Sequence, residues 1–268
     1  MKTEELIKRR EAILEEIVGY FSSDPAVQAI FVGGSLPAGS ADAFSDVDLR
    51  VVVTPETHAR FVENRLEMPK QWKGFLFNEW MPGAQHCVSH FRQFVKVDIF
   101  YYSQDKLQPS PWYSFPQTVL YDPKGIVSKL VESSPPFKFE FDERRVDWVM
   151  SKGLAAAHEV FRRCRRGELI FAQNLLEEFR LRVAEADDWI HQRVATNPAE
   201  LKWERRLTPS LVQALRESYV PTDAAAIETA MLNLLTIFQE QVTALHKTYA
   251  LSRSLANDLA AVDILLEA

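Results

Sequence analysis

Little in this sequence suits a secreted, membrane-spanning or nucleic-acid-binding protein. It has two cysteines in 268 residues, Cys87 and Cys164, which lie too far apart for a CxxC motif and are too few for a disulfide framework. No apolar run approaches the ~20 residues of a membrane span, and no signal-like segment opens the chain. The net charge is −6, so the chain lacks a general basic surface for nucleic acid. These absences predict a cytoplasmic protein with no membrane partner, and they make a nucleic-acid partner unexpected.

The chain is nevertheless rich enough in apolar residues to form a core. Hydrophobic residues make up 47% of the 268 positions, and a chain of this length forms one large or two modest domains. The run Ser133-Ser134-Pro135-Pro136 has the composition of a domain boundary. We therefore predict two domains, residues 1–135 and residues 136–268.

The two parts differ in the periodicity of their apolar residues. The first has a helical pattern over 3–22 and then short alternating segments that are typical of strands. The second has helical patterns throughout, over 143–166, 168–195, 209–219, 223–249 and 252–266, with Asn197-Pro198 expected to end the second of them. Helices joined by short connections predict a bundle. The predicted fold class is α+β, with a sheet domain followed by a helical bundle.

One stretch of the first domain combines glycines with paired aspartates. Residues 27–32 read as a buried strand that ends at Gly33-Gly34-Ser35, and residues 46–53 alternate as a second strand. A period of two places Asp46 and Asp48 on one face, about 7 Å apart along the strand. Two carboxylates held that close repel each other, and a divalent cation with oxygen ligands, such as magnesium, is the usual solution.

A third aspartate interrupts a later apolar strand. Residues 94–101 alternate, and Asp98 lies in the middle of them. A carboxylate is costly in such a strand unless it has a partner. An ion pair with Lys96 or with an arginine is one explanation. A role as the third acid of the site formed by Asp46 and Asp48 is the other.

The glycine–aspartate stretch resembles the signature of nucleotidyltransferases related to polymerase beta, the group that includes the aminoglycoside adenylyltransferases. The residues that carry the resemblance are Gly34-Ser35, Gly39, Ala41-Asp42 and Ser45-Asp46-Val47-Asp48-Leu49. The chain departs from the pattern at Pro37-Ala38, where a small residue followed by a basic one is expected. A second, less specific likeness to the helical domain of aminoglycoside-type transferases lies in Arg166-Gly167-Glu168, Ala172 and Leu175.

The resemblance implies a mixed-sheet nucleotidyltransferase domain and a reaction that depends on two Mg²⁺ ions and on ATP. Asp46 and Asp48 are then expected to bind the metals. Asp98 would match the third acid that the family places on a later strand, as metal ligand and as the base for the acceptor hydroxyl. Gly34 and Ser35 would hold the β- and γ-phosphates.

Two further expectations concern the triphosphate and the acceptor. Lys152, near the start of the first bundle helix, is the best single candidate for a lysine on the triphosphate. The acceptor is expected to be a small and cationic molecule, with an aminoglycoside-like antibiotic suggested by the resemblance, and Asp142, Glu143 or Asp147 could face it. A protein or tRNA acceptor is an alternative, and so is a non-catalytic nucleotide-binding module that kept the fold.

Overall fold

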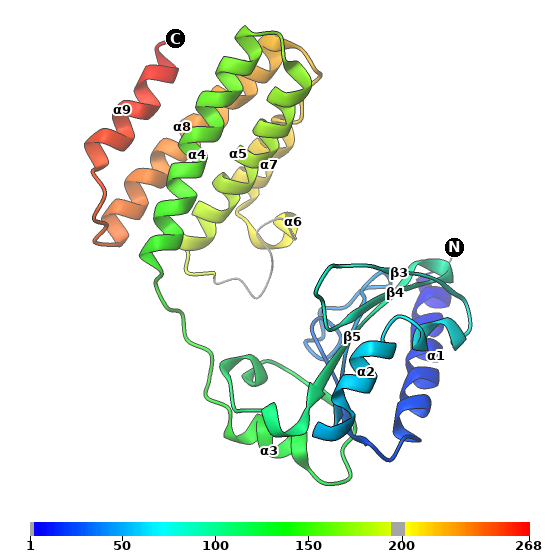
Figure 1. Ribbon diagram of the computed structural model, residues 1–268. Coiled ribbons are helices and arrows are strands. Elements are labelled where there is room, and N and C mark those ends of the chain that lie inside the picture. The colour runs from blue at the N-terminus through cyan, green and yellow to red at the C-terminus, as the bar shows by residue number, and fades with distance from the viewer. Residues whose placement is uncertain (1–2, 194–201) are drawn as a thin grey trace. The chain divides into compact units, whose positions relative to one another are not determined.

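The chain divides into two compact units, Met1–Lys138 and Phe139–Ala268 (Figure 1). The computed structural model describes residues 3–193 and 202–268. The first unit is built on a mixed sheet and the second unit is helical. This confirms the predicted α+β class, a mixed-sheet domain followed by a helical bundle.

The sheet of the first unit has six strands in the order β3-β4-β5-β2-β1-β6. Their bounds are Val27–Gly33 (β1), Val47–Val53 (β2), Phe75–Glu79 (β3), Cys87–Phe91 (β4), Val95–Ser103 (β5) and Thr118–Tyr121 (β6). The central pair β2 and β5 is parallel, and the other neighbours are antiparallel. The sheet is therefore mixed, with its parallel pair at the centre.

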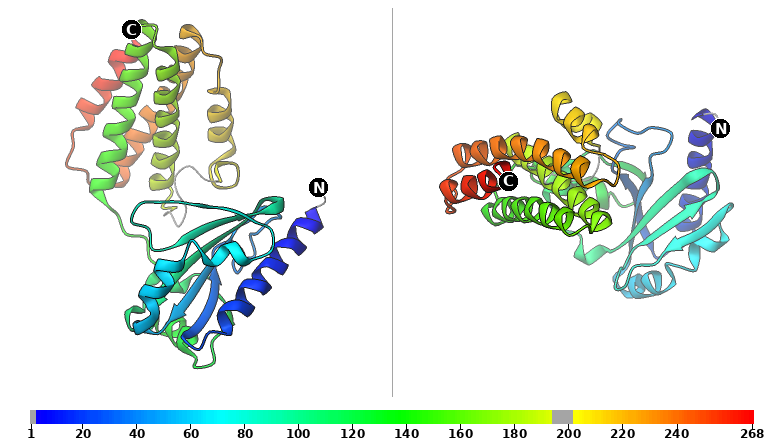
Figure 2. Two further views of the ribbon diagram at one scale, coloured as in Figure 1. Left: turned by 45° about the vertical axis from the view of Figure 1, so that its right-hand side comes forward. Right: turned by 90° about the horizontal axis from the view of Figure 1, so that it is seen from above.

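Helices cover the two faces of this sheet unequally. Helix α1 (Thr3–Ser22) packs along β1, β2 and β5, and α2 (His58–Asn64) packs beside β5 on the same face (Figure 2). On the other face, α3 (Ile126–Ser133) packs over β1 through Val127. Buried and partly exposed residues alternate regularly along β5. Because the buried set packs into the α1 core, the intervening residues, Asp98 among them, point to the opposite face.

The second unit is a bundle built around three long helices. Its helices are α4 (Glu143–Arg165), α5 (Leu169–Ile190), α6 (Trp203–Arg206), α7 (Pro209–Glu217), α8 (Ala224–Thr248) and α9 (Leu255–Leu266). α4 packs against both α5 and α8, and a continuous apolar core runs between them. A Cβ added at Gly153 on α4 would overlap the Phe238 ring on α8, so this glycine sets how closely the two helices approach.

Several predicted element ends shift in the structure. The helix predicted over 168–195 ends at Ile190, and residues 191–192 form a turn. Its last residues and Asn197-Pro198 lie outside the described residues. The strand predicted to start at Asp46 starts at Val47. The short helix α6 was not predicted, because four residues contain too little periodicity to be recognised.

A cluster of charged side chains closes one end of the bundle. Asp188 is buried and receives Arg206 Nη1 at 2.6 Å and Arg193 Nε at 3.3 Å, while Arg193 also pairs with Asp187. Burial raises the pKa of Asp188 to about 6, although the two arginines act in the opposite direction.

Among the helices of residues 3–193 and 202–268, none combines the length and apolar character of a membrane span.

Candidate active site

The parallel pairing of β2 with β5 brings two of the three predicted aspartates together. Asp48 and Asp98 are direct Cα partners across this pair. Neighbouring strands lie about 4.8 Å apart, and partners in register point to the same face. Both side chains therefore leave the sheet side by side, on the face away from α1. The two residues are 50 positions apart in the sequence, so only strand pairing makes them neighbours.

Asp46 lies one residue before β2, at the end of a loop that a buried arginine holds. Arg10 on α1 donates from Nη1 to the carbonyl oxygens of Asp42 at 2.7 Å and Ser45 at 3.1 Å. The Ser45 hydroxyl also closes the loop, since its Oγ accepts from the Asp42 backbone N–H at 2.8 Å. The position of Asp46 is therefore determined by these contacts and not by the pleat of a strand.

Lys96 joins Asp46 to Asp98. Its Nζ lies 2.8 Å from Asp46 Oδ2 and 3.3 Å from Asp98 Oδ2. The ion pair that the sequence suggested for Asp98 is therefore present, and it includes Asp46 as well. Asp46, Asp48 and Asp98 lie close enough to interact, because the first two both influence the pKa of the third.

The electrostatics of this group reflect burial and crowding of like charges. Burial raises the pKa of Asp98 above its ordinary value, Asp46 and Asp48 raise it further, and Lys96 offsets only part of the rise. Burial alone would lower the pKa of Lys96, but the bonds to Asp46 and Asp98 prevail, so its pKa lies above the ordinary value. The carboxylates therefore favour a nearby cation.

Gly34 allows the backbone to pass close to Asp48. It follows β1 with φ +75°, and a Cβ added to it would overlap the Asp48 carboxylate and lie 3.0 Å from Asp48 Cγ. Both features require glycine. Ser35 follows at the start of the loop and is partly exposed, and its carbonyl accepts from the Ser40 N–H at 3.1 Å. The Gly34–Ser35 segment and the aspartates are thus adjacent, as a site that binds phosphate and metal requires.

The three aspartates fit a divalent metal by the chemistry of their donors. Carboxylate oxygens are the ligands that Mg²⁺ prefers. Asp98 Oδ1 is buried and has no hydrogen-bond partner within the described part of the chain. Leaving such an atom without a partner is costly, so a ligand at this position would be stabilising. In residues 3–193 and 202–268, no group of three acidic, histidine or cysteine side chains is already arranged to hold a metal. The Lys96 ammonium is the cation that two of these carboxylates contact instead.

The predicted residues of the second unit serve its own structure or remain exposed. Lys152 lies on α4 with an exposed side chain, and its role on the triphosphate stays a prediction. Asp142 caps α4 by accepting from the Arg145 N–H at 3.1 Å. Glu143 accepts from the Ser252 N–H at 2.7 Å, which lowers its pKa, and Asp147 pairs with Arg253 at 2.8 Å. The three acids are thus tied to backbone or arginine partners within the bundle.

Sequence reasoning missed two arginines of the first unit. Arg10 follows Leu6 and precedes Ile13 on the buried stripe of α1, so a charged residue in that stripe was the available signal. Arg50 donates to the Asp48 carbonyl at 3.0 Å and lies between the rings of Phe31 and Phe100. No local pattern indicates that contact.

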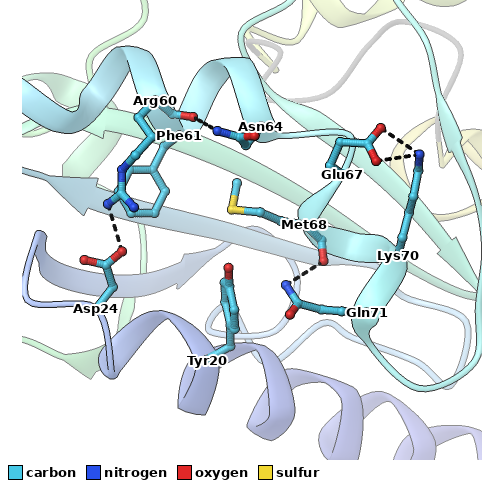
Figure 3. A pocket seen from close by; sticks show the side chains of 9 residues that line it. All are labelled: Tyr20, Asp24, Arg60, Phe61, Asn64, Glu67, Met68, Lys70 and Gln71. Atoms are coloured by element: carbon cyan, nitrogen blue, oxygen red, sulfur yellow. Dashed lines mark hydrogen bonds and ion pairs between the residues drawn. The ribbon is translucent and has the colours of Figure 1, made fainter.

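A surface pocket of about 540 Å³ is separate from the aspartates (Figure 3). It lies on the face of the sheet that α1 and α2 cover. Its lining residues are Tyr20, Asp24, Arg60, Phe61, Asn64, Glu67, Met68, Lys70 and Gln71. Its charged side chains pair with each other, Arg60 with Asp24 at 2.8 Å and Lys70 with Glu67 at 2.6 Å. Since the site aspartates point to the other face, this pocket is not part of their site.

A family model and several solved structures are similar to this chain. The family model described as streptomycin adenylyltransferase matches residues 7–262. Among solved structures, an aminoglycoside 6-adenyltransferase from Bacillus subtilis is 14% identical with a TM-score of 0.46, covering 96% of this chain and 97% of that one. A nucleotidyltransferase-like protein from Exiguobacterium sibiricum 255-15 is 14% identical with a TM-score of 0.39, covering 88% and 77%. No curated protein matches the chain.

The family assignment rests on the family model, since both structural likenesses are distant. Its match begins within α1 and ends within α9, so it includes Gly34, the three aspartates and the bundle. The match therefore covers most of both units. The chain is an adenylyltransferase and belongs to the streptomycin adenylyltransferase family.

Proposed function

We propose that the protein transfers AMP from ATP to a hydroxyl group of a small cationic molecule, releases pyrophosphate and depends on Mg²⁺. The main observation that supports this proposal is the register of β2 and β5. It aligns Asp48 with Asp98, and it does so where Asp98 Oδ1 is buried and finds no hydrogen-bond partner among the residues that the structure describes. A purely structural sheet gains nothing from adjacent carboxylates, which repel each other.

In this proposal each residue of the site has one task. Asp46, Asp48 and Asp98 would hold the metal, which neutralises triphosphate charge and lowers the pKa of the attacking hydroxyl when bound. Asp98 also accepts the hydroxyl proton as the acceptor oxygen bonds to the α-phosphorus and the bond to the leaving pyrophosphate breaks. The backbone at Gly34 and Ser35 donates N–H groups to the phosphates. Lys152 is proposed as a further positive charge on the triphosphate.

The acceptor we propose is an aminoglycoside-like antibiotic, which would make the enzyme a resistance factor. Two observations support it: the family description names streptomycin, and the chain carries a net charge of −6. An acidic protein attracts a polycationic aminosugar, and added salt weakens that attraction by screening charges beyond ~8 Å at physiological ionic strength.

The test is pyrophosphate release with ATP, CTP, GTP and UTP against a panel of aminoglycosides, lincosamides, tRNA and proteins. We expect turnover with ATP and an aminosugar in Mg²⁺, and loss of metal-dependent nucleotide binding in Asp46→Asn and Asp48→Asn. Asp98→Asn should keep much of the ATP affinity but lose about 10²–10⁴-fold in turnover, as for a missing base. Asp24→Asn, in the ion pair with Arg60, is the matched control and should stay active.

The outcomes separate the proposal from its alternatives. If tRNA or a protein supported turnover and no aminosugar did, the proposed acceptor would be wrong, but the proposed nucleotidyl transfer would stand. Nucleotide binding with no turnover across the panel would favour a non-catalytic module. Full activity of Asp98→Asn would remove it as the base.

A further inference from the structure

Lys96 occupies a position within the carboxylate site that neither the family match nor the proposed reaction explains. It lies two residues before Asp98 on β5, so both side chains leave the same face of the sheet. Its ammonium contacts Asp46 at 2.8 Å and Asp98 at 3.3 Å, and it thereby bridges two residues from different segments. The Lys96 side chain is one-third exposed, so it can leave this position without disturbing the core.

The ammonium does for these two carboxylates what a metal ion would do. A cation between them offsets their mutual repulsion, and charge-assisted hydrogen bonds hold them in place. It contacts Oδ2 of each carboxylate, and in residues 3–193 and 202–268 Asp98 Oδ1 still has no hydrogen-bond partner. The Lys96 ammonium carries a single charge on a flexible side chain. It is thus a partial substitute for a divalent cation, which could bind more of these carboxylate oxygens.

We propose that Lys96 is a resident counter-ion that a divalent metal must displace from Asp46 and Asp98. The inference rests on the proposed metal-dependent function. Lys96 keeps the carboxylates in position while the metal is away, and it weakens the binding of free metal. The metal then enters efficiently only with the nucleotide, whose phosphate oxygens supply additional ligands.

The expected effect can be estimated from the charges involved. The interaction of two unit charges about 4 Å apart in water changes an equilibrium constant by about fivefold. A metal ion has twice the charge, and salt screens part of the repulsion. Removing the ammonium should therefore tighten metal binding by about tenfold.

The experiment measures Mn²⁺ binding to the full chain without nucleotide, by the electron paramagnetic resonance signal of free Mn²⁺. Lys96→Met should bind Mn²⁺ about tenfold more tightly than the wild type, whereas Lys96→Arg should resemble the wild type because it keeps the charge. Lys70→Met is the matched control, since it breaks the ion pair with Glu67 in the surface pocket, and its Mn²⁺ affinity should not change. The double variant Lys96→Met/Asp98→Asn should lose the gain, which would locate the ion. Mn²⁺ should also raise the Tm of Lys96→Met more than that of the wild type.

Equal or weaker Mn²⁺ binding by Lys96→Met would overturn the inference. The proposed function would still stand in that case if the wild type bound α,β-methylene-ATP only in the presence of Mn²⁺. If neither the wild type nor any variant bound Mn²⁺, and none bound the ATP analogue more tightly in its presence, both the inference and the proposed metal chemistry would be wrong.

Discussion

Replacement of Gly34 by alanine tests the link between the backbone turn and the aspartates that we propose as metal ligands. Gly34→Ala adds one methyl group at a position with φ +75°, where that methyl would overlap the Asp48 carboxylate. Gly83 is a matched control, because it also has φ +75° but has nothing within 4 Å of an added Cβ. The two variants therefore share the backbone strain and differ in the contact with the site.

The expected losses of stability and activity follow from the backbone strain and from the contact with Asp48. An alanine in the left-handed region costs about 1–2 kcal/mol, and we expect Gly34→Ala and Gly83→Ala both to lose that much stability. Only Gly34→Ala must also move either the loop or Asp48, since its Cβ would lie 3.0 Å from Asp48 Cγ and still closer to Oδ2. A displacement near 1 Å in an active site can cost about 10²-fold in rate. We expect a loss of about 10²-fold in kcat/KM for Gly34→Ala and of less than about twofold for Gly83→Ala.

The assay compares pyrophosphate release per folded molecule with the Tm from circular dichroism. Similar Tm losses with a selective loss of activity in Gly34→Ala would support the reasoning. Equal activities of the two variants would refute it, because the contact with Asp48 would then have no influence on the site.

Three further predictions concern the supports of the site and the bundle. Arg10→Met should lose about 1–3 kcal/mol of stability together with its hydrogen bonds to the 42–45 loop. Activity per folded molecule should fall at least about tenfold, while Arg9→Met, at the partly exposed neighbouring position, should stay active, as measured by denaturant unfolding and pyrophosphate release. The pKa of Asp188 is raised from 3.8 to about 6, so its contribution to stability is fully present below pH 3.8 and is lost as the pH rises through 6. That loss amounts to about 3 kcal/mol, and Asp188→Asn should remove this part of the decline in unfolding free energy between pH 4 and 7. Gly153→Ala should destabilise the bundle by about 1–3 kcal/mol in denaturant, because its Cβ would overlap the Phe238 ring; an unchanged midpoint would show that α4 and α8 can move apart at no cost.

Local sequence patterns predicted most of the secondary structure and the fold class. The alternation over 94–101 predicted β5 and placed Asp98 on the face opposite its apolar neighbours, as the structure shows. Helical spacing predicted the long bundle helices, with ends accurate to a few residues except at 168–195. The glycine and aspartate spacing indicated the family, which the family model shows independently. These features depend on residues within a few positions of each other, where backbone geometry imposes a fixed period.

The detailed site depended on contacts between distant segments. The sequence could not predict that β2 begins one residue after Asp46. The alternation of polar and apolar residues already starts at Asp46, outside the residues that form the strand. The role of Arg10 in holding the loop before Asp46 arises only when α1 packs on the sheet. The overlap between Gly34 and Asp48 arises only when β1 pairs with β2.

The sequence by itself determined which residues alternate, which segments form helices and which glycines and aspartates carry the likeness to the family, because these properties are set by neighbours along the chain. Only the tertiary structure decided that β2 and β5 run parallel with Asp48 opposite Asp98, and that Lys96 reaches Asp46. Strand order and register are fixed by the packing of whole faces against α1 and α3, and a shift of one residue would turn every side chain to the other face. Such long-range pairing leaves no periodic trace in either strand alone.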